Sequence, residues 1–234
     1  MTDAAGGAAP TGPAGSAARP PASLSTFYAR RGKRLFDLVA GLCLMLVFSP
    51  IMAVLALVVL FSSGRPILFV QQRVGQAGRR FNLVKFRTMV PNAVSQGAGF
   101  YIEENDERIT SAGSWLRLTS LDELPQVINV VKGDLSLVGP RPNLPMIVSR
   151  YSSSYEKILL VKPGLTGLAA VRGRNLLRRS QMLALDVEYV ETLSFLNDLK
   201  IVLATVPVGV LRHGSSNAVA EDFIEDAAAD DGRE

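Results

Sequence analysis

Two adjacent carboxylates, Asp122 and Glu123, stand in the segment "TSLDELPQVINVVKGD", at the expected start of a helix. In a first helical turn, such residues can simply offset the helix dipole while they stay solvated. The same position also favours a bound phosphate and lowers the pKa of a carboxylate, so Asp122 would stay ionised and able to attack phosphorus. Glu123 and Asp122 also offer the hard oxygen ligands that Mg²⁺ prefers. The pair therefore indicates phosphoryl-transfer chemistry.

The helix that presents this pair is predicted over residues 121–132. Thr119 or Ser120 provides an N-cap, Pro125 is tolerated because it lies near the start, and Gly133 ends the helix. Apolar residues at helical spacing predict its buried face. These residues are Leu121, Leu124, Ile128 and Val131.

Basic residues accompany the pair in three stretches, "QQRVGQAGRRFNLVKFRTM", "RITSAGSWLRLTS" and "GPRPN". Arginine binds phosphate through two hydrogen bonds, and glycine lets the backbone approach an anion closely. One such cluster is usually a solvated surface, but three beside glycine, proline and apolar residues favour an anion pocket. The predicted phosphate- or nucleotide-binding residues are Arg73, Lys85, Arg87, Arg117 and Arg141.

The single cysteine and the single histidine narrow the chemistry. Cys43 alone gives no disulfide and no thiolate metal site within one chain, which fits a reducing cytoplasm for the main domain. His213 alone gives no pair of histidine metal ligands. Acid–base and nucleophilic work in an enzyme would therefore fall to carboxylates.

The formal net charge of +4 hides an asymmetry, because the last 14 residues hold seven acids and one arginine. The rest of the chain carries +10, which favours an anionic partner such as nucleic acid, an acidic membrane surface or a phosphorylated substrate. No helix-turn-helix, RNP or zinc-knuckle signature is present in the sequence. We therefore expect no nucleic-acid partner.

Four segments follow from composition. Residues 1–28 are a predicted disordered tail because Ala, Gly, Pro and Ser dominate them. Residues 29–63 carry basic residues and then a long apolar block. Residues 64–212 form the main domain, and residues 213–234 are an acidic tail.

The main domain mixes two periodicities. Short β-like runs, "PILFVQQRV", "FNLVKFRTM" and "LSLVGPRP", alternate with helical stretches at residues 121–132 and 183–211. This pattern predicts a small α+β fold dominated by helices. Residues 195–211 are apolar around much of the helix, so we expect them to be buried or to lie in a membrane interface as an amphipathic helix.

The apolar block contains 26 residues without charge, 38–63, enough for one helix to cross a bilayer. Basic residues before it predict a cytoplasmic N-terminal end. Pro50 removes a backbone hydrogen bond and kinks a helix, and the Ser49 hydroxyl can satisfy the freed carbonyl. A kinked, re-entrant helix would return Arg65 to the cytoplasmic side, whereas a spanning helix would not. Charge alone leaves both topologies open.

Most of the chain, from about residue 33 to 205, carries motifs that belong together. These are "KRLFDLVAGLCLMLVFSP", "QQRVGQAGRRFNLVKFRTM", "RIT…WLRLTSLDELPQVINVVKGDLSLVGPRP", "KPGLTGLAAVRGRN" and "DVEYV…LNDLKIVLATV". They resemble the bacterial sugar transferases, the monotopic polyprenol-phosphate phosphoglycosyl transferases, and here the small, minimal type. The "SLDELPQ…GDLSLVGPRP" run is long and specific.

The resemblance implies a reaction. Asp122 would attack the β-phosphorus of a UDP-sugar, release UMP and hold a phosphosugar–aspartyl intermediate. Polyprenol (undecaprenyl) phosphate would then take the phosphosugar, which starts the assembly of a glycoconjugate. Glu123 and Mg²⁺ would steady the diphosphate, Arg117 and Lys85 are candidates for phosphate contacts, and Arg141 is the candidate for the nucleotide side.

The resemblance also implies a place in the cell. Its members carry a Ser-Pro break like Ser49-Pro50, which favours the re-entrant helix, with the catalytic domain on the cytoplasmic face of the inner membrane. A homo-oligomer is possible. Where many members have Trp-Gln, this chain has Ala169-Ala170, which leaves open a second hypothesis: a catalytically silent membrane scaffold for glycan assembly.

Overall fold

The computed structural model of the chain describes residues 21–95, 106–173 and 177–211. Its longest element is α1 (Lys33–Ser63), which follows the charge-free segment as one unbroken helix with Pro50 inside it. The Ser49 hydroxyl donates to the Leu46 carbonyl at 3.0 Å, which is the carbonyl that Pro50 cannot reach from its own nitrogen. The Ser49 hydroxyl thus satisfies the Leu46 carbonyl as expected, whereas the kink at Pro50 and the re-entrant path of the helix stay predictions.

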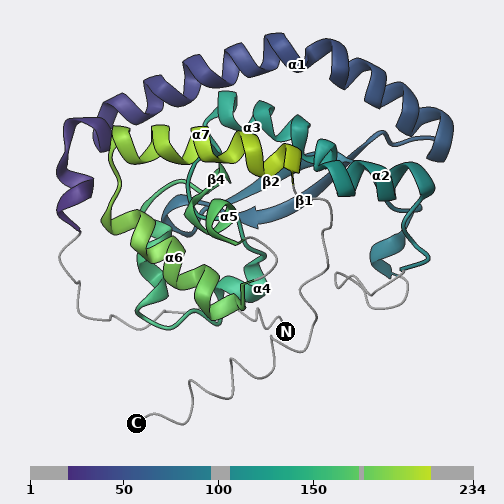
Figure 1. Cartoon of the computed structure of the whole chain (residues 1–234). Coiled ribbons are helices and arrows are strands. Elements are labelled where there is room, and N and C mark those ends of the chain that lie inside the picture. Colours follow the sequence, from purple (N-terminus) through teal and green to yellow (C-terminus); the bar gives the residue numbers. More distant parts are fainter. Residues whose placement is uncertain (1–20, 96–105, 174–176, 212–234) are drawn as a thin grey trace, which may run out of the picture.

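Figure 1 shows α1 arching over the rest of the molecule. Near its start, the Lys33 ammonium lies 2.6 Å from Asp198 Oδ2 and donates to the Val138 carbonyl at 2.9 Å. Past its other end, the Arg87 guanidinium donates to the Ser63 and Gly64 carbonyls. Both ends of the helix are thus held by the same body of the protein.

The middle of α1 has a different environment. Leu46 and Val47 are 78% and 65% exposed, and Val54 is 59% exposed. Within the described residues, the segment Tyr28–Ser63 is the one helix long and apolar enough to cross a membrane. Only 11% of its most apolar window is buried inside the protein, so this helix is not a core helix of the domain.

The strands form two small sheets. An antiparallel hairpin pairs β1 (Leu68–Val74) with β2 (Arg80–Phe86). A parallel pair joins β3 (Ser136–Val138) to β4 (Gly164–Thr166). The three β-like runs of the sequence are confirmed as β1, β2 and β3.

Helices make up most of the remaining domain, which confirms the helix-dominated α+β class. The predicted helix over residues 183–211 is wrong in one respect, because Thr192–Ser194 separates two helices. The other helical elements are η1 (Ala22–Ser25), η2 (Tyr28–Gly32), η3 (Gln76–Gly78), η4 (Ala93–Ser95), α2 (Ser111–Thr119), η5 (Leu121–Gln126), α3 (Val127–Lys132), α4 (Pro145–Val148), η6 (Tyr155–Leu160), α5 (Leu168–Arg172), α6 (Arg179–Glu191) and α7 (Phe195–Leu211).

Two apolar clusters anchor the arch of α1. One lies between the first half of α1, α6 and α7, where Tyr189 and Val190 are fully buried. The other joins the second half of α1 to β2 and α2 through Val59, Phe86 and Leu116. Because fully burying one such side chain stabilises a fold by roughly 1.5–3 kcal/mol, these clusters fix the arch on the domain.

The N-terminal boundary of the ordered chain differs from the prediction. Residues 21–28 were expected in a disordered tail, but they form η1 and lead into η2. The Ser23 hydroxyl donates to the Val190 carbonyl at 2.7 Å, and the Tyr28 hydroxyl donates to Asp198 at 2.6 Å. Residues 1–20 and the acidic tail at 213–234 lie outside the described residues.

Candidate active site

The carboxylate pair lies in η5, between α2 and α3. Ser120 takes a left-handed conformation (φ 58°) that ends α2 and starts η5 without a side-chain cap. The Thr119 hydroxyl instead bonds back to α2 carbonyls. The expected N-cap and the single α-helix over 121–132 are therefore wrong. Gly133 (φ 93°) does end α3 as predicted, since glycine takes this conformation without strain.

The buried face of this segment also differs from the prediction. The four apolar residues expected in the core are only half-buried. Buried instead are Gln126, Val127, Asn129 and Val130. The reason is that α1 covers α3 from one side while β2 meets it from another: the Asn129 amide donates to the Asn82 carbonyl at 2.8 Å, and its oxygen accepts from the Val84 nitrogen at 3.1 Å.

Two cations converge on Glu123. Lys85 Nζ lies 2.8 Å from Glu123 Oε1, and Arg141 Nη2 donates to the same oxygen at 3.2 Å. The Lys85 and Glu123 side chains are 19% and 17% exposed, whereas the Arg141 side chain is 59% exposed. Three residues predicted from separate stretches of sequence therefore meet at one carboxylate.

Asp122 is buried, with 9% of its surface exposed. In the described part of the chain, no hydrogen-bond donor lies on its carboxylate. Burial raises the pKa of Asp122, and the charges of Lys85, Arg117 and Arg141 oppose that rise while Glu123 adds to it. The expectation that the helix start lowers this pKa is wrong, because desolvation outweighs the dipole of a short 3-10 turn.

Arg117 lies in the last turn of α2, where its charge acts on Asp122. Its Nε donates to the Thr88 hydroxyl at 2.8 Å. Burial lowers the pKa of the Arg117 guanidinium, and the charge of Asp122 works against that change. Arginine stays protonated at neutral pH even so. The Asp122 carboxylate therefore lies in the field of three cations.

Arg73 lies on β1 and makes no hydrogen bond to the carboxylate pair within the described residues. Its guanidinium donates to the Pro142 carbonyl at 3.2 Å and to the Gln71 side chain at 2.6 Å. Burial, followed by the charge of Arg141, lowers the pKa of Arg73 to about 10. This residue contacts the loop that carries Arg141 rather than the carboxylates.

Arg87, like Arg73, makes no hydrogen bond to the carboxylate pair among the residues that the structure describes. Its guanidinium binds the Ser63 and Gly64 carbonyls at the end of α1. Its Nε and Nη1 are buried and have no partner within the described residues. The contacts of Arg87 fix α1 to β2, and phosphate binding by Arg87 stays a prediction.

The carboxylates of the site can supply only part of the coordination that Mg²⁺ requires. The described residues contain no group of three or more Asp, Glu, His or Cys side chains that could hold a metal. Mg²⁺ is commonly held by one or two carboxylates, with water and substrate phosphates completing its octahedron. Asp122 and Glu123 fit that pattern as a pair, and they do not make an all-protein metal cage.

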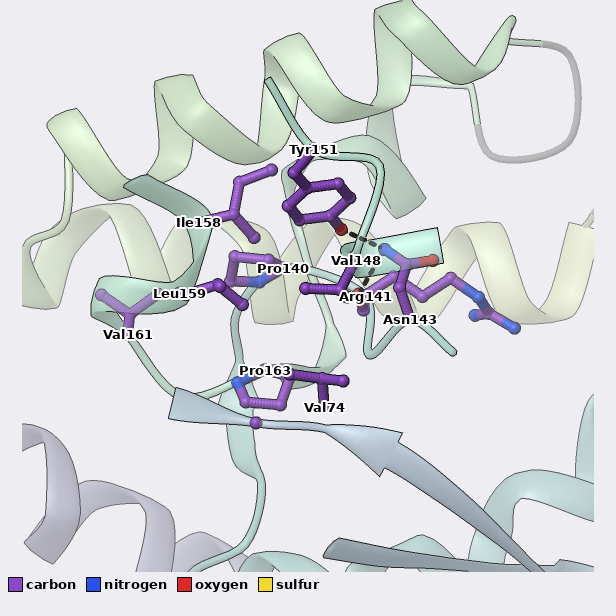
Figure 2. Close-up of a pocket in the computed structure, with 11 residues that line it drawn as sticks. Val74, Pro140, Arg141, Asn143, Val148, Tyr151, Ile158, Leu159, Val161 and Pro163 are labelled. Atoms are coloured by element: carbon purple, nitrogen blue, oxygen red, sulfur yellow. Dashed lines mark hydrogen bonds between the residues drawn. The ribbon is translucent and has the colours of Figure 1, made fainter. Parts of the chain in front are cut away.

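Several residues of the site were missed from the sequence. Figure 2 shows a shallow pocket beside Arg141 whose walls include Val74, Pro140 and Ile158, with Tyr151 and Asn143 on its polar side. Asp186 of α6 lies behind the Arg141 peptide. Burial raises the pKa of Asp186 to about 7, against hydrogen bonding and charge from Arg141. No local pattern marks these residues, because their partners are distant in sequence.

Ala169 and Ala170, at which the sequence departs from the motif of the family it resembles, lie in α5. Ala169 is buried, with 7% of its surface exposed. Helix α5 packs against α6 and α7 rather than η5. The two alanines therefore lie on a different element from the one that carries the carboxylates.

The site therefore consists of a carboxylate pair close to three cations. It lies in a helix-dominated domain over which the long apolar helix α1 arches. This combination is the one expected of a protein that binds an anionic substrate beside a membrane. The sequence profile of the bacterial sugar transferase family matches residues 28–212. The chain belongs to this family, and it is an enzyme of the transferase class.

Three relatives illustrate the similarity. The uncharacterized sugar transferase EpsL of Bacillus subtilis is 41% identical over 82% of this chain and 95% of its own length. The exopolysaccharide production protein ExoY of Rhizobium meliloti is 36% identical over 78% of this chain and 87% of its own. The UDP-glucose:undecaprenyl-phosphate glucose-1-phosphate transferase of Caulobacter vibrioides is 41% identical over 75% of this chain and 68% of its own.

Proposed function

We propose that this protein transfers a sugar-1-phosphate from a UDP-sugar to polyprenol phosphate through a covalent intermediate on Asp122. The observation that carries the proposal is the Asp122 carboxylate itself. It is buried, bears no hydrogen-bond donor within the described residues, and is surrounded by Lys85, Arg117 and Arg141. The relatives include an undecaprenyl-phosphate galactose phosphotransferase of Salmonella typhimurium, which supports the same reaction class.

The first step forms a bond between an Asp122 carboxylate oxygen and the β-phosphorus of the donor. The bond from that phosphorus to the bridging oxygen breaks, and UMP leaves with the electron pair. In the second step, a phosphate oxygen of the polyprenol phosphate attacks the same phosphorus. The bond to Asp122 breaks, its carboxylate is restored, and a polyprenyl-diphospho-sugar is released.

The charges around the pair suit both steps. Negative charge builds up on the phosphoryl oxygens during the transfer, and cations fixed in a partly buried site stabilise it strongly. Lys85 and Arg141 are already held by Glu123, so their positions are set before the donor binds. The Arg117 guanidinium is held by its hydrogen bond to the Thr88 hydroxyl.

Mg²⁺ is the proposed cofactor, with Glu123 and Asp122 as its protein ligands. When bound, it would neutralise charge on the diphosphate of the donor. Glu123 also binds both Lys85 and Arg141. We expect a chelator to abolish turnover, and added Mg²⁺ to restore it.

The membrane placement follows from α1. A helix of 31 residues is about 46 Å long, whereas the hydrocarbon core of a bilayer is about 30 Å thick. A straight, spanning α1 would put its ends on opposite sides, but Lys33 and Ser63 both contact the same domain. We propose that α1 enters and leaves one leaflet with its bend at Ser49-Pro50, which keeps the domain on the cytoplasmic face of the inner membrane.

Other exposed apolar residues support the same orientation. Leu196 and Leu203 on α7 are 66% and 64% exposed, and Trp115 on α2 is 49% exposed. Aromatic and aliphatic side chains on surface helices bind the interface of a bilayer. We propose that α2 and α7 contact the headgroup region next to α1.

The proposed function is tested by measuring UMP release from a panel of UDP-sugars in detergent with Mg²⁺, with and without polyprenol phosphate. Release with one donor that is lost in Asp122→Asn supports the proposal and identifies the sugar. Silence across the panel, with folded protein and lipid present, would overturn it in favour of a membrane scaffold.

A further inference from the structure

Thr88 lies just after β2, where two elements that carry cations of the site meet. It follows Lys85 of β2 by three positions, and its hydroxyl accepts from Arg117 Nε of α2 at 2.8 Å. Thr88 is 6% exposed, so this hydroxyl is a buried acceptor. Among the described residues, it is the one hydrogen-bond partner of the Arg117 guanidinium.

The backbone of Thr88 is held by the start of α2. Its carbonyl accepts from the Thr110 nitrogen at 3.0 Å and from the Thr110 hydroxyl at 3.4 Å. Gly113 packs directly against the same carbonyl, because a Cβ atom at that position would overlap it. The Thr88 side chain therefore extends from a backbone position that is fixed relative to α2.

The backbone of Arg117 is joined in turn to the carboxylate pair. The Ser120 nitrogen donates to the Arg117 carbonyl at 3.1 Å, and the Glu123 nitrogen donates to the Ser120 carbonyl at 3.2 Å. These two bonds set the place of the Arg117 backbone next to the segment that carries Asp122. They leave the long side chain of Arg117 free to rotate about its own bonds, and that freedom is what a contact at the guanidinium removes.

The bond from Nε leaves the rest of the Arg117 guanidinium for a ligand. Arginine carries five N–H donors in one plane, and the Nε–H is one of them. The donors on the two Nη atoms have the geometry that binds a phosphate through two parallel hydrogen bonds. Because the guanidinium is planar, a bond at Nε also fixes the direction in which the Nη donors point.

We propose that Thr88 is a positioning residue for the transfer reaction: its hydroxyl holds the Arg117 guanidinium in the orientation that presents the Nη donors to the phosphates of the UDP-sugar. This inference rests on the proposed function for its kinetic consequence. Its structural half, the hydrogen bond between Arg117 Nε–H and the Thr88 hydroxyl, is measured without any substrate.

Three substitutions of Thr88 separate positioning from packing. T88S keeps the hydroxyl and loses the methyl group, T88V keeps the shape and loses the hydroxyl, and T88A loses both. We expect kcat/KM to fall by about tenfold in T88V and T88A, and to stay within about twofold of wild type in T88S. A residue that only filled space would give the opposite grouping, with T88S and T88A reduced together and T88V like wild type.

The matched control removes a threonine hydroxyl elsewhere. The Thr192 hydroxyl donates to the Glu188 carbonyl at 2.8 Å, at an exposed position after α6. T192V therefore makes the same chemical change as T88V and also removes one hydrogen bond. Its kcat/KM should equal that of wild type.

A double-mutant cycle tests whether the effect of Thr88 passes through Arg117. R117M removes the guanidinium, so the Thr88 hydroxyl then has nothing to orient. In single-turnover reactions, T88V should lower the rate by about tenfold in wild type but by less than about twofold in the R117M background. An equal loss in both backgrounds overturns the proposal.

Exchange of the Arg117 Nε proton tests the structural half by NMR. This proton, assigned by its absence from the R117M spectrum, should exchange with water at least about tenfold more slowly than the Nε proton of the exposed Arg150. T88S should keep this protection, whereas T88V and T88A should lose it. Equal rates for Arg117 and Arg150 in wild type contradict the contact, even if T88V and T88A do not fold.

The outcomes separate the inference from the proposed function. Wild type that turns over no UDP-sugar overturns the function, while the Arg117 Nε proton still decides the contact with Thr88. Where wild type is active, T88V and T88A near the wild-type rate overturn the inference alone. T88S as slow as T88A also overturns it, because the methyl group and not the hydroxyl would then matter.

Discussion

The Lys85 ammonium lies 2.8 Å from Glu123 Oε1, and this ion pair joins β2 to the segment that carries Asp122. Glu123 is therefore already engaged with protein cations before any substrate phosphate arrives. An incoming diphosphate would compete with Glu123 for Lys85 and Arg141. In the proposed function, Glu123 therefore holds Lys85 and Arg141 at the positions where they would bind the phosphates of the donor.

Replacing the proposed nucleophile gives the most direct test. Asp122→Asn removes the attacking oxygen charge without changing the shape of the buried side chain, so we expect kcat to fall by at least about a thousandfold. Wild type incubated with donor alone should gain the mass of one phosphosugar, and the variant should gain none. Turnover of the variant near the wild-type rate would contradict the covalent mechanism. Membrane association should be the same in both proteins.

Lys85 and Arg87 are close in sequence but should behave differently. Lys85→Met leaves the fold nearly unchanged and should lower kcat/KM by about 10²–10³, as expected for losing a cation from a phosphoryl-transfer site. Arg87→Met removes the contacts to the end of α1 and should lower the melting temperature instead. Measuring both quantities for both variants checks the assignment. Equal losses of activity with unchanged melting temperatures would return Arg87 to the phosphate site.

Breaking the ion pair at the start of α1 should lower the free energy of unfolding by several kcal/mol, at about the level expected for an unpaired buried charge. Asp198 is fully buried and accepts from Lys33, Tyr28 and Tyr189. Lys33→Met leaves that carboxylate without its cation, so the free energy of unfolding should fall by about 3–5 kcal/mol. Adding Asp198→Asn should recover part of the loss. Denaturation in detergent measures both effects.

The matched control for that pair is at the surface. Lys157 and Glu191 form an ion pair with side chains 41% and 48% exposed. Lys157→Met should therefore change stability by less than about 1 kcal/mol. A loss as large as that of Lys33→Met would show that charge alone, rather than burial, determines the cost.

Pro50 should control the path of α1 through the membrane. Pro50→Ala restores a backbone donor to Leu46 and favours a straight helix, so we expect an N-terminal tag to become protected from a membrane-impermeant protease added to the cytoplasmic side. Leu57→Ala, at an exposed position of the same helix, should leave the tag accessible. A tag equally accessible in Pro50→Ala would refute the role of the bend.

Asn129 should be required for stability because it joins α3 to the backbone of β2. Its side chain bonds to both free backbone groups at the edge of β2, and Asn129→Ala leaves them buried without partners. We expect a loss of about 1–3 kcal/mol in the free energy of unfolding. Asn82→Ala removes an exposed side chain but keeps the carbonyl that Asn129 uses, so it should be almost neutral. Chemical denaturation of the two variants distinguishes them.

The elements that could be predicted from the sequence have local causes. Strands β1 and β2 follow from short β-like runs, although their antiparallel pairing does not, and the end of α3 follows from the freedom of Gly133 to take positive φ. The association of Lys85 and Arg141 with the carboxylate pair also follows from the types of residue present. Chemistry that depends on composition within a few residues is visible before folding.

The features that could not be predicted depend on contacts across the chain. The buried face of α3 is set by β2 and by α1, whose Gly41 packs against Val130, so helical spacing alone chose the wrong residues. The raised pKa of Asp122 comes from burial that no single segment reveals. Asp186 is buried on α6, and its burial depends on elements distant in sequence, so the sequence of the helix alone gives no sign of it.

The contact between Lys33 and Asp198 also has a consequence for synthesis on the ribosome. The two residues are 165 positions apart, and Ser136, which binds Asp37 of the same helix, also comes about a hundred positions after it. Translation therefore delivers the apolar helix long before the residues that hold its first turns exist. During that interval the nascent helix has no protein partner for its first turns, so in the proposed membrane placement its insertion into lipid would precede the closure of the domain beneath it.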